Sequence, residues 1–300
     1  MCAYLAGCPS VRSGSEREWL TGGDARPGCW PEPAGWRMDL LMPDAPGADP
    51  AVRLALEVAL VRAVPPASVL RIWQNEACVV LGRGQRLERE VNAAAAAAAR
   101  VPVLRRASGG GTVYHDPGNL NITIVVPGWV PGLTGDLAAL VAGVLRRSGL
   151  APVTAQRGVF AGSLNGPVKL SGLAGHLTRA ATLAHATLLV TTPAAQVLAF
   201  LAPAPPDTHP LDSRRSPVLP LSDLVSGMSV PAARSLVLAE AADRYGQLTP
   251  RPVTAAEACW QRRLMAQRYG SGAWHTTGRA PTMRTEEAQW TTKPALTCTG

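Results

Sequence analysis

The sequence predicts an α+β fold in which a largely antiparallel sheet is flanked by helices. Strand-like segments follow one another directly in the centre of the chain, and helical segments lie at both ends of this region. No internal repeat is visible. A regular alternation of strands and helices would instead indicate a parallel βαβ sheet. The order of the segments therefore favours antiparallel pairing with helices packed on the sheet.

The helices are predicted from their caps and from apolar residues at helical spacing. Asp49-Pro50 is a strong helix start, because an acid can cap the helix and proline fits its first turn. Pro65-Pro66 ends this helix. Thr254 and Glu257 form the pattern of a capping box for another. Further helices are predicted over residues 88–100, 136–147, 231–245 and 255–269, and from Thr192-Pro193 onward.

The strands are predicted from short β-branched and aliphatic runs bounded by turn residues. Residues 69–73 and 77–81 are typical of a β-hairpin. The other strands are predicted over residues 101–104, 112–114, 120–126, 168–173 and 183–190. Residues 203–220 are rich in proline, and we expect an irregular loop there.

The two ends of the chain differ from its centre. Residues 1–37 mix Gly, Pro, Ser, Cys and Trp without periodicity, so we expect a poorly ordered extension. Met38 is a candidate for the true start. Residues 279–300 are similar and are expected to form a flexible tail. Residues 38–278 are therefore expected to fold as the single functional domain.

The charge pattern restricts the choice of partners. The chain has a net charge of +8, only two lysines, and no Asp or Glu between residues 137 and 206, so this stretch should attract anions. Basic residues do not form runs interleaved with aromatic residues, which argues against nucleic acid. No apolar run approaches the ~20 residues of a membrane helix, and the start lacks a basic signal region. We therefore expect a cytoplasmic protein with no membrane partner.

A glycine-rich segment between two predicted strands is the most informative part of the sequence. The adjacent glycines 109–111 leave backbone N–H groups that a ligand can approach closely. Arg105 and Arg106, just before them, could neutralise a phosphate or a carboxylate. A hairpin turn with a basic edge is the alternative, because short glycine motifs often occur without a ligand. The segment lacks the Gly-Lys-Ser/Thr ending of a Walker loop.

Lys169 is the second informative feature. Strand alternation places Val168 and Leu170 on one face and Lys169 and Ser171 on the other. A lysine beside a serine and a glycine can hold a developing negative charge, although an exposed strand lysine is the simpler interpretation. Arginine supplies almost all other positive charge in the chain. The retained lysine therefore indicates a need for a compact ammonium group.

Together these segments resemble the lipoate–protein ligase and octanoyltransferase superfamily. The family pattern Arg-Arg-x-Ser-Gly-Gly-Gly-x-Val-[Tyr/Phe]-His-Asp-x-Gly-Asn is matched almost completely at residues 105–119. The family's Lys-[Ile/Val]-Ser-Gly-x-Ala pattern is similar to residues 169–174. Residues 70–85 resemble the family's first hairpin, and residues 183–190 resemble its His-His-Gly-Thr-Leu-Leu strand. The resemblance covers roughly residues 50–275 and implies a biotin/lipoate protein ligase-like catalytic domain.

This resemblance implies a function, a set of ligands and a set of site residues. The implied enzyme attaches a lipoyl or octanoyl group to a carrier lysine through an acyl-adenylate, with ATP and Mg²⁺. Lys169 would be catalytic, stabilising charge on the α-phosphate and on the tetrahedral oxyanion. The implied binding residues are Arg83, Arg106, Ser108, Gly109, Gly110, Gly111, His115, Asn119, Ser171, Gly172, His185 and Thr187. The implied partners are acidic lipoyl carrier domains and acyl carrier protein, while metal ligands and oligomeric state stay open.

Several positions depart from the family pattern, so three interpretations stay open. Family ligases carry an Asn-Asp dipeptide before the lysine, whereas residues 156–168 contain no acid. Ala184 and Ala186 replace the family's His and Gly. The transferase branch uses a cysteine, but none occurs between Cys78 and Cys259. The chain is an ATP-dependent ligase with or without a partner subunit, a cysteine-independent transferase using an acyl-carrier donor, or a non-catalytic relative that binds lipoyl domains.

Overall fold

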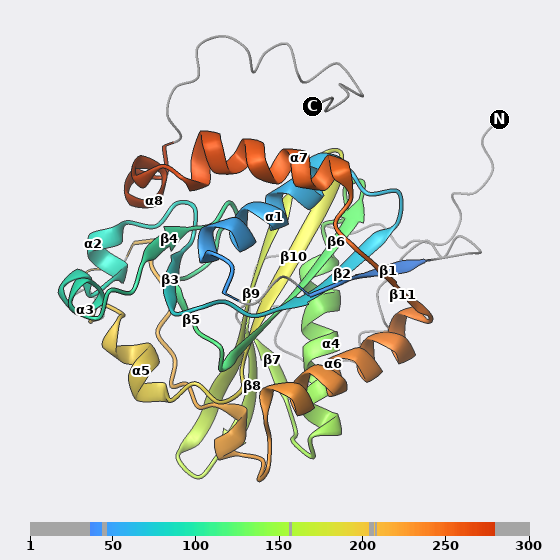
Figure 1. Ribbon diagram of the computed structural model, residues 1–300. Coiled ribbons are helices and arrows are strands. Elements are labelled where there is room, and N and C mark those ends of the chain that lie inside the picture. The colour runs from blue at the N-terminus through green and yellow to red at the C-terminus, as the bar shows by residue number, and fades with distance from the viewer. Residues whose placement is uncertain (1–36, 44–46, 156–157, 204–206, 208, 280–300) are drawn as a thin grey trace, which may run out of the picture. The chain divides into compact units, whose positions relative to one another are not determined.

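The structure is a computed structural model that describes residues 37–43, 47–155, 158–203, 207 and 209–279 (Figure 1). The N-terminal extension and the C-terminal tail predicted from the sequence lie almost wholly outside these residues. The described residues form the predicted α+β fold. None of the described helices is long and apolar enough to cross a membrane.

A sheet of eight strands forms the centre of the fold, in the order β11-β1-β2-β6-β10-β9-β8-β7. Its neighbours are antiparallel from β2 to β7, whereas β1 is parallel to both β2 and β11. The prediction of a largely antiparallel sheet is therefore confirmed. The strands are β1 (Met38–Leu41), β2 (Ser68–Trp73), β6 (Asn119–Pro127), β7 (Val153–Ala155), β8 (Gly158–Ser163), β9 (Gly166–Leu177), β10 (Ala181–Leu189) and β11 (Leu248–Arg251).

A second sheet of three strands carries the glycine-rich segment. The central strand β3 (Cys78–Leu81) is parallel to β4 (Val103–Arg105) and antiparallel to β5 (Val113–His115). The predicted hairpin of residues 69–73 with 77–81 is wrong, because β2 joins the large sheet and β3 the small one. Both strands are buried along their whole length. Each therefore needs neighbours on both sides, which an isolated hairpin cannot supply.

Helices cover both faces of the large sheet (Figure 1). Helices α1 and α7 pack together on one face, while α4 and α6 pack together on the other. These helices are α1 (Pro50–Ala63), α4 (Leu133–Arg147), α6 (Val230–Tyr245) and α7 (Ala255–Leu264). Shorter helical segments are α2 (Leu87–Glu90), α3 (Ala93–Ala98), α5 (Ala194–Ala199), the 3-10 turn Leu221–Asp223, the π-helical turn Met265–Tyr269 and α8 (Gly272–Thr277).

The predicted caps are present, but one predicted helix is interrupted. The Asp49 carboxylate accepts a hydrogen bond from the Ala51 amide at 2.8 Å, and Thr254 with Glu257 makes both bonds of the capping box. The helix expected over residues 88–100 is instead divided into α2 and α3. It breaks at Asn92, whose side chain accepts from the first turn of α3. A short polar side chain that bonds the local backbone competes with helix continuation.

The strands missed by prediction lie at or near the edges of the large sheet. All three residues of β7 are exposed, so the sequence shows no alternation between buried and polar positions there. Strand β11 contains Pro250, which cannot donate to a strand ladder. Strand β11 is the last in the strand order and pairs only with β1, so it tolerates this proline.

Candidate active site

A cavity of about 540 Å³ is the candidate active site. It is lined by residues of α1, the glycine-rich segment, β9, β10 and the loop that follows α5. Pockets for small molecules have volumes of roughly 300–1,000 Å³. Its apolar lining includes Leu54, Trp73, Val80, Val113, Leu173, Ala174, Ala186 and Leu211. The cavity is therefore large enough, and apolar enough, for a ligand with a hydrocarbon part.

Most site residues predicted from the sequence meet at this cavity. Those that line it are Arg106, Gly109, Gly110, Gly111, His115, Lys169, Gly172, His185 and Thr187. The other four do not line it: Arg83 is exposed, and Ser108, Asn119 and Ser171 are buried. Asn119 supports the wall, because its side-chain amide donates to Oδ1 of Asn121, a lining residue, at 3.1 Å.

The glycine-rich loop is held against the loop after β3 by a close backbone approach. A Cβ added at Gly82 would lie 2.1 Å from the carbonyl oxygen of Gly110, so only glycine fits there. Gly110 itself has a φ of +84°, which favours glycine. Strands β4 and β5, on either side of this loop, run in opposite directions but are separated by β3. The loop therefore crosses the end of the small sheet and is not a hairpin turn.

Both arginines before the glycines hold the loop in place through hydrogen bonds, and Arg106 also lines the cavity. The Arg105 guanidinium donates to six backbone carbonyls, those of Gly82, Arg83, Gln85, Trp274, His275 and Thr276. The Arg106 guanidinium donates to Ser108 Oγ and to the carbonyls of Val80, Gly109 and Gly111. Burial lowers the pKa of Arg106 to about 10, so it stays charged at neutral pH. These bonds fix the shape of the loop.

Lys169 faces the cavity from β9, but Ser171 does not share its face. The pairing of β8 with β9 shifts by one residue between Val159 and Phe160, and this bulge interrupts the alternation assumed from the sequence. Lys169 and Gly172 consequently line the cavity, whereas Ser171 is buried and its hydroxyl has no partner among the described residues. The prediction that Lys169 and Ser171 lie on one face is therefore wrong.

The Lys169 side chain is half-buried and is not the solvated strand lysine that the sequence suggests. Its Cε would lie 2.7 Å from a Cβ added at Gly158, so the chain packs closely over that glycine. Burial lowers the pKa of its ammonium group. Among the described residues, no carboxylate forms an ion pair with it. Lys169 thus presents a partly desolvated positive charge to the cavity.

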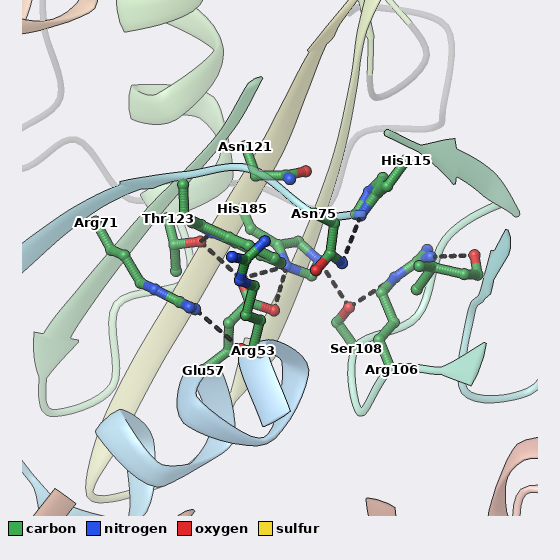
Figure 2. A network of polar contacts seen from close by, with 12 residues as sticks. Arg53, Glu57, Arg71, Asn75, Arg106, Ser108, His115, Asn121, Thr123 and His185 are labelled. Atoms are coloured by element: carbon green, nitrogen blue, oxygen red, sulfur yellow. Dashed lines mark hydrogen bonds and ion pairs between the residues drawn. The ribbon is translucent and has the colours of Figure 1, made fainter. Parts of the chain in front are cut away.

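A chain of three polar side chains joins α1, β10 and the glycine-rich loop (Figure 2). The Glu57 carboxylate lies 3.0 Å from His185 Nδ1, and His185 Nε2 lies 2.8 Å from Ser108 Oγ. Thr123 Oγ1 also donates to Glu57, at 2.6 Å. Burial alone would raise the pKa of Glu57, but the charge and hydrogen bond of His185 and the bond from Thr123 lower it to about 2. The carboxylate therefore orients His185 and, through it, the start of the loop.

Two buried donors on the cavity wall lack a hydrogen-bond partner in the part of the chain that the structure describes. His115 Nδ1 lies 3.3 Å from the Asn75 amide nitrogen, which donates, so the proton of the neutral ring is on Nε2. Burial lowers the pKa of His115 to about 3, so the ring stays neutral. His115 Nε2 and Asn121 Nδ2 are both buried without a partner among the described residues. Because unpaired buried donors are costly, these two groups are candidate contacts for a ligand.

Sequence reasoning missed Glu57, Asn121, Gln85 and the loop residues 209–214 that line or support the cavity. For Glu57 a signal exists, since it is the only acid in the otherwise apolar stretch 54–61 and is 3% exposed. Gln85 ends the segment 70–85 that resembles a family hairpin, and this resemblance does not predict that Gln85 lines the cavity. The loop after α5 gave no signal, because proline-rich segments have no periodicity. Cys78 is buried, and burial raises the pKa of its thiol, so it is no nucleophile.

The sequence matches a known protein family over most of the described fold. A family model described as the lipoyl protein ligase A/B catalytic domain matches residues 49–242. The putative lipoate-protein ligase A of Aeropyrum pernix is 35% identical over 161 residues, which cover 52% of this chain and 60% of that protein. The probable lipoate-protein ligase A of Mycoplasma pneumoniae is 33% identical over 136 residues, covering 44% and 39%. The chain thus spans less than two thirds of the length of these curated relatives.

Solved structures agree with this match. The structure described as a bi-partite lipoate protein ligase and its E2 lipoyl domain, from Thermoplasma acidophilum, superposes with a TM-score of 0.70 at 26% identity. The superposed region covers 82% of this chain and 98% of the Thermoplasma acidophilum chain. Lipoate-protein ligase A bound with ATP superposes with a TM-score of 0.69 at 24% identity, covering 81% and 99%. The second similarity shows a common fold.

Proposed function

The chain belongs to the lipoyl protein ligase A/B catalytic domain family, and from this premise we propose that it attaches a lipoyl or octanoyl group to a lysine of a lipoyl carrier domain. The observation that carries the proposal is the cavity, in which Lys169 and the loop glycines 109–111 meet an apolar wall. An acyl chain requires the apolar wall, and its carboxyl group requires a cation and polar groups such as the backbone N–H groups of the loop.

The proposed reaction has two steps. In the first, a carboxylate oxygen of the acid attacks the α-phosphorus of ATP, and pyrophosphate leaves. In the second, the neutral amine of the carrier lysine attacks the acyl carbon, an amide bond forms, the bond to the phosphate breaks, and AMP leaves while the amine proton passes to solvent. Negative charge develops on phosphate oxygens in the first step and on the acyl oxygen in the second. The Lys169 ammonium, which faces the cavity without an acidic partner among the described residues, would stabilise both charges.

The residues of the cavity do not offer a site for Mg²⁺ made of protein carboxylates. Only two carboxylates, Glu57 and Asp212, line it among the described residues. Glu57 is bonded to His185, and Asp212 accepts two bonds from Arg89, at 2.6 and 2.9 Å. Protein sites for Mg²⁺ usually offer one or two available carboxylates. The proposed mechanism therefore routes no step through a metal held by the protein.

Exchange of labelled pyrophosphate into ATP tests the first step. We expect the full chain to catalyse this exchange only when lipoate or octanoate is present, because the acyl-adenylate forms reversibly. Omission of the acid is the control. Acyl transfer to a lipoyl domain from an acyl-carrier donor, without pyrophosphate exchange, would show that the chain acts as a transferase and not as a ligase. If neither reaction occurs, the chain alone is not the catalyst, and restored exchange on addition of a partner subunit distinguishes a ligase with a partner from a non-catalytic relative that binds lipoyl domains.

We further propose that the carrier is an acidic domain, as the net charge of +8 favours. The stretch 137–206, which contains no Asp or Glu, supports an acidic partner less than the sequence suggests. Arg147 within it already pairs with Glu240 and Asp243 of α6. Binding of a lipoyl domain should weaken as salt rises, since exposed charges are screened over ~8–10 Å at physiological ionic strength. Titration of the full chain with a lipoyl domain at several salt concentrations measures this. A dissociation constant independent of salt would exclude an electrostatic interface.

A further inference from the structure

Two cations of the cavity remain available for a ligand. Among the described residues, the Asp, Glu, Lys and Arg side chains that line it are Glu57, Arg106, Lys169, Asp212 and Arg214. Glu57 is bonded to His185, Arg106 to the glycine-rich loop, and Asp212 to Arg89. Lys169 and Arg214 have no ion-pair or side-chain hydrogen-bond partner among the described residues. Lys169 belongs to β9, whereas Arg214 belongs to a loop from a distant part of the chain.

That loop, which we call the strap (residues 209–218), is anchored on the loop after β3. Gln85 Nε2 donates to Ser213 Oγ at 2.9 Å and to the Leu211 carbonyl at 3.2 Å. The same Ser213 hydroxyl accepts from the Thr112 amide at 2.7 Å. The strap therefore lies directly against the glycine-rich segment.

Further anchors connect the strap to α2 and to β9. The Ser213 amide donates to Glu90 Oε1 at 2.7 Å, and Arg215 pairs with the same carboxylate at 3.5 Å. The Pro217 carbonyl accepts from the Lys169 amide at 2.8 Å. Residues 212, 213 and 215 thus all have partners, whereas Arg214, an exposed residue that lines the cavity, has no side-chain partner among the described residues. The anchoring of its neighbours holds Arg214 in place.

We propose that Arg214 binds the phosphate groups of the nucleotide, as a second cation beside Lys169. The inference rests on the proposed function, because the ligand is the ATP of the same reaction. A guanidinium presents a planar pair of donors that fits a phosphate, and it keeps its charge at any physiological pH. Its neighbours in the cavity add no free acid that would repel a polyphosphate, since both lining carboxylates are already bonded.

Calorimetric titration of the full chain with ATP, inorganic pyrophosphate and adenosine tests the proposal. We expect Arg214→Gln to weaken binding of ATP and of pyrophosphate about 10-fold, the loss of one charge-assisted hydrogen bond. Adenosine, which has no phosphate, should bind equally to both proteins. Arg214→Lys should recover part of the affinity. The matched control is Arg86→Gln, because Arg86 is an exposed arginine next to Gln85 that does not line the cavity.

The outcomes separate this inference from the proposed function. If the wild type binds ATP and Arg214→Gln binds it equally well, the inference fails and the proposed function stands. If Arg214→Gln loses adenosine as strongly as ATP, Arg214 only supports the fold of the strap, and the inference fails. If the wild type binds pyrophosphate but not ATP, the inference fails, because its ligand is ATP, and the ligase is excluded as well. If the wild type binds no phosphate ligand, both are overturned.

Discussion

Replacement of Lys169 by alanine should lower the rate of acyl transfer about 10²–10³-fold, the usual loss for one preorganised donor at a developing charge. The side chain faces the cavity, has no acidic partner among the described residues, and is partly desolvated. Neither water nor a carboxylate therefore fully screens its attraction for negative charge on the substrate. Lys169→Arg should recover little, because a planar guanidinium differs from an ammonium in reach and geometry. Its larger head must also fit over Gly158, against which Lys169 already packs.

The measurement is transfer of an octanoyl or lipoyl group to a lipoyl-domain lysine, with thermal unfolding of each variant run in parallel. Lys169→Ala should melt close to the wild type, because the lysine makes no ion pair among the described residues and loses only its packing over Gly158. The natural control is Arg179→Ala, which removes an exposed cation near the far end of β9. Transfer by Lys169→Ala at the wild-type rate would exclude Lys169 from the mechanism.

The site residues that could be predicted are those whose sequence neighbours form a motif. Lys169 and the glycines 109–111 are found in this way, and they do meet at one cavity. The face of Ser171 could not be predicted, because alternation assumes a regular strand and the bulge in β9 leaves no reliable sign in the sequence. The partners of Arg105 could not be predicted either, since three of its six carbonyls come from α8, about 170 residues away.

The fold was predictable where pattern and burial agree. The capped helix α1 and the strands β6 and β10 have clear sequence signals and lie in the centre of the structure. The pairing of strands was not predictable, because a fully buried strand such as β2 shows no face preference that would select its neighbours. The strap could not be predicted because its position depends on the side chains of Gln85, Arg89 and Glu90, which lie more than 100 residues earlier.

Replacement of Glu57 by alanine should destabilise the protein by about 1–3 kcal/mol for each buried donor that loses its acceptor. Glu57 is 3% exposed and is bonded to His185 and Thr123. Its loss leaves His185 without an acceptor and frees the link to Ser108 at the start of the glycine-rich loop. Glu57→Gln, which keeps the shape and one acceptor oxygen, should cost less. Urea unfolding measures both, with the exposed Glu76→Gln as the control.

The pH dependence of the Glu57→Gln difference distinguishes a lost charge from lost packing. The pKa of Glu57 is about 2 in the folded protein against 4.5 as the ordinary value. Its ionised form therefore adds stability that is complete above pH 4.5 and is lost as the pH falls towards 2. Protonation of the buried His115 ring also lowers the stability in acid, but this effect is common to the wild type and Glu57→Gln. The gap in unfolding free energy between wild type and Glu57→Gln should thus narrow between about pH 5 and pH 3. A constant gap over this range would show that Glu57 acts through packing and that its charge does not hold His185.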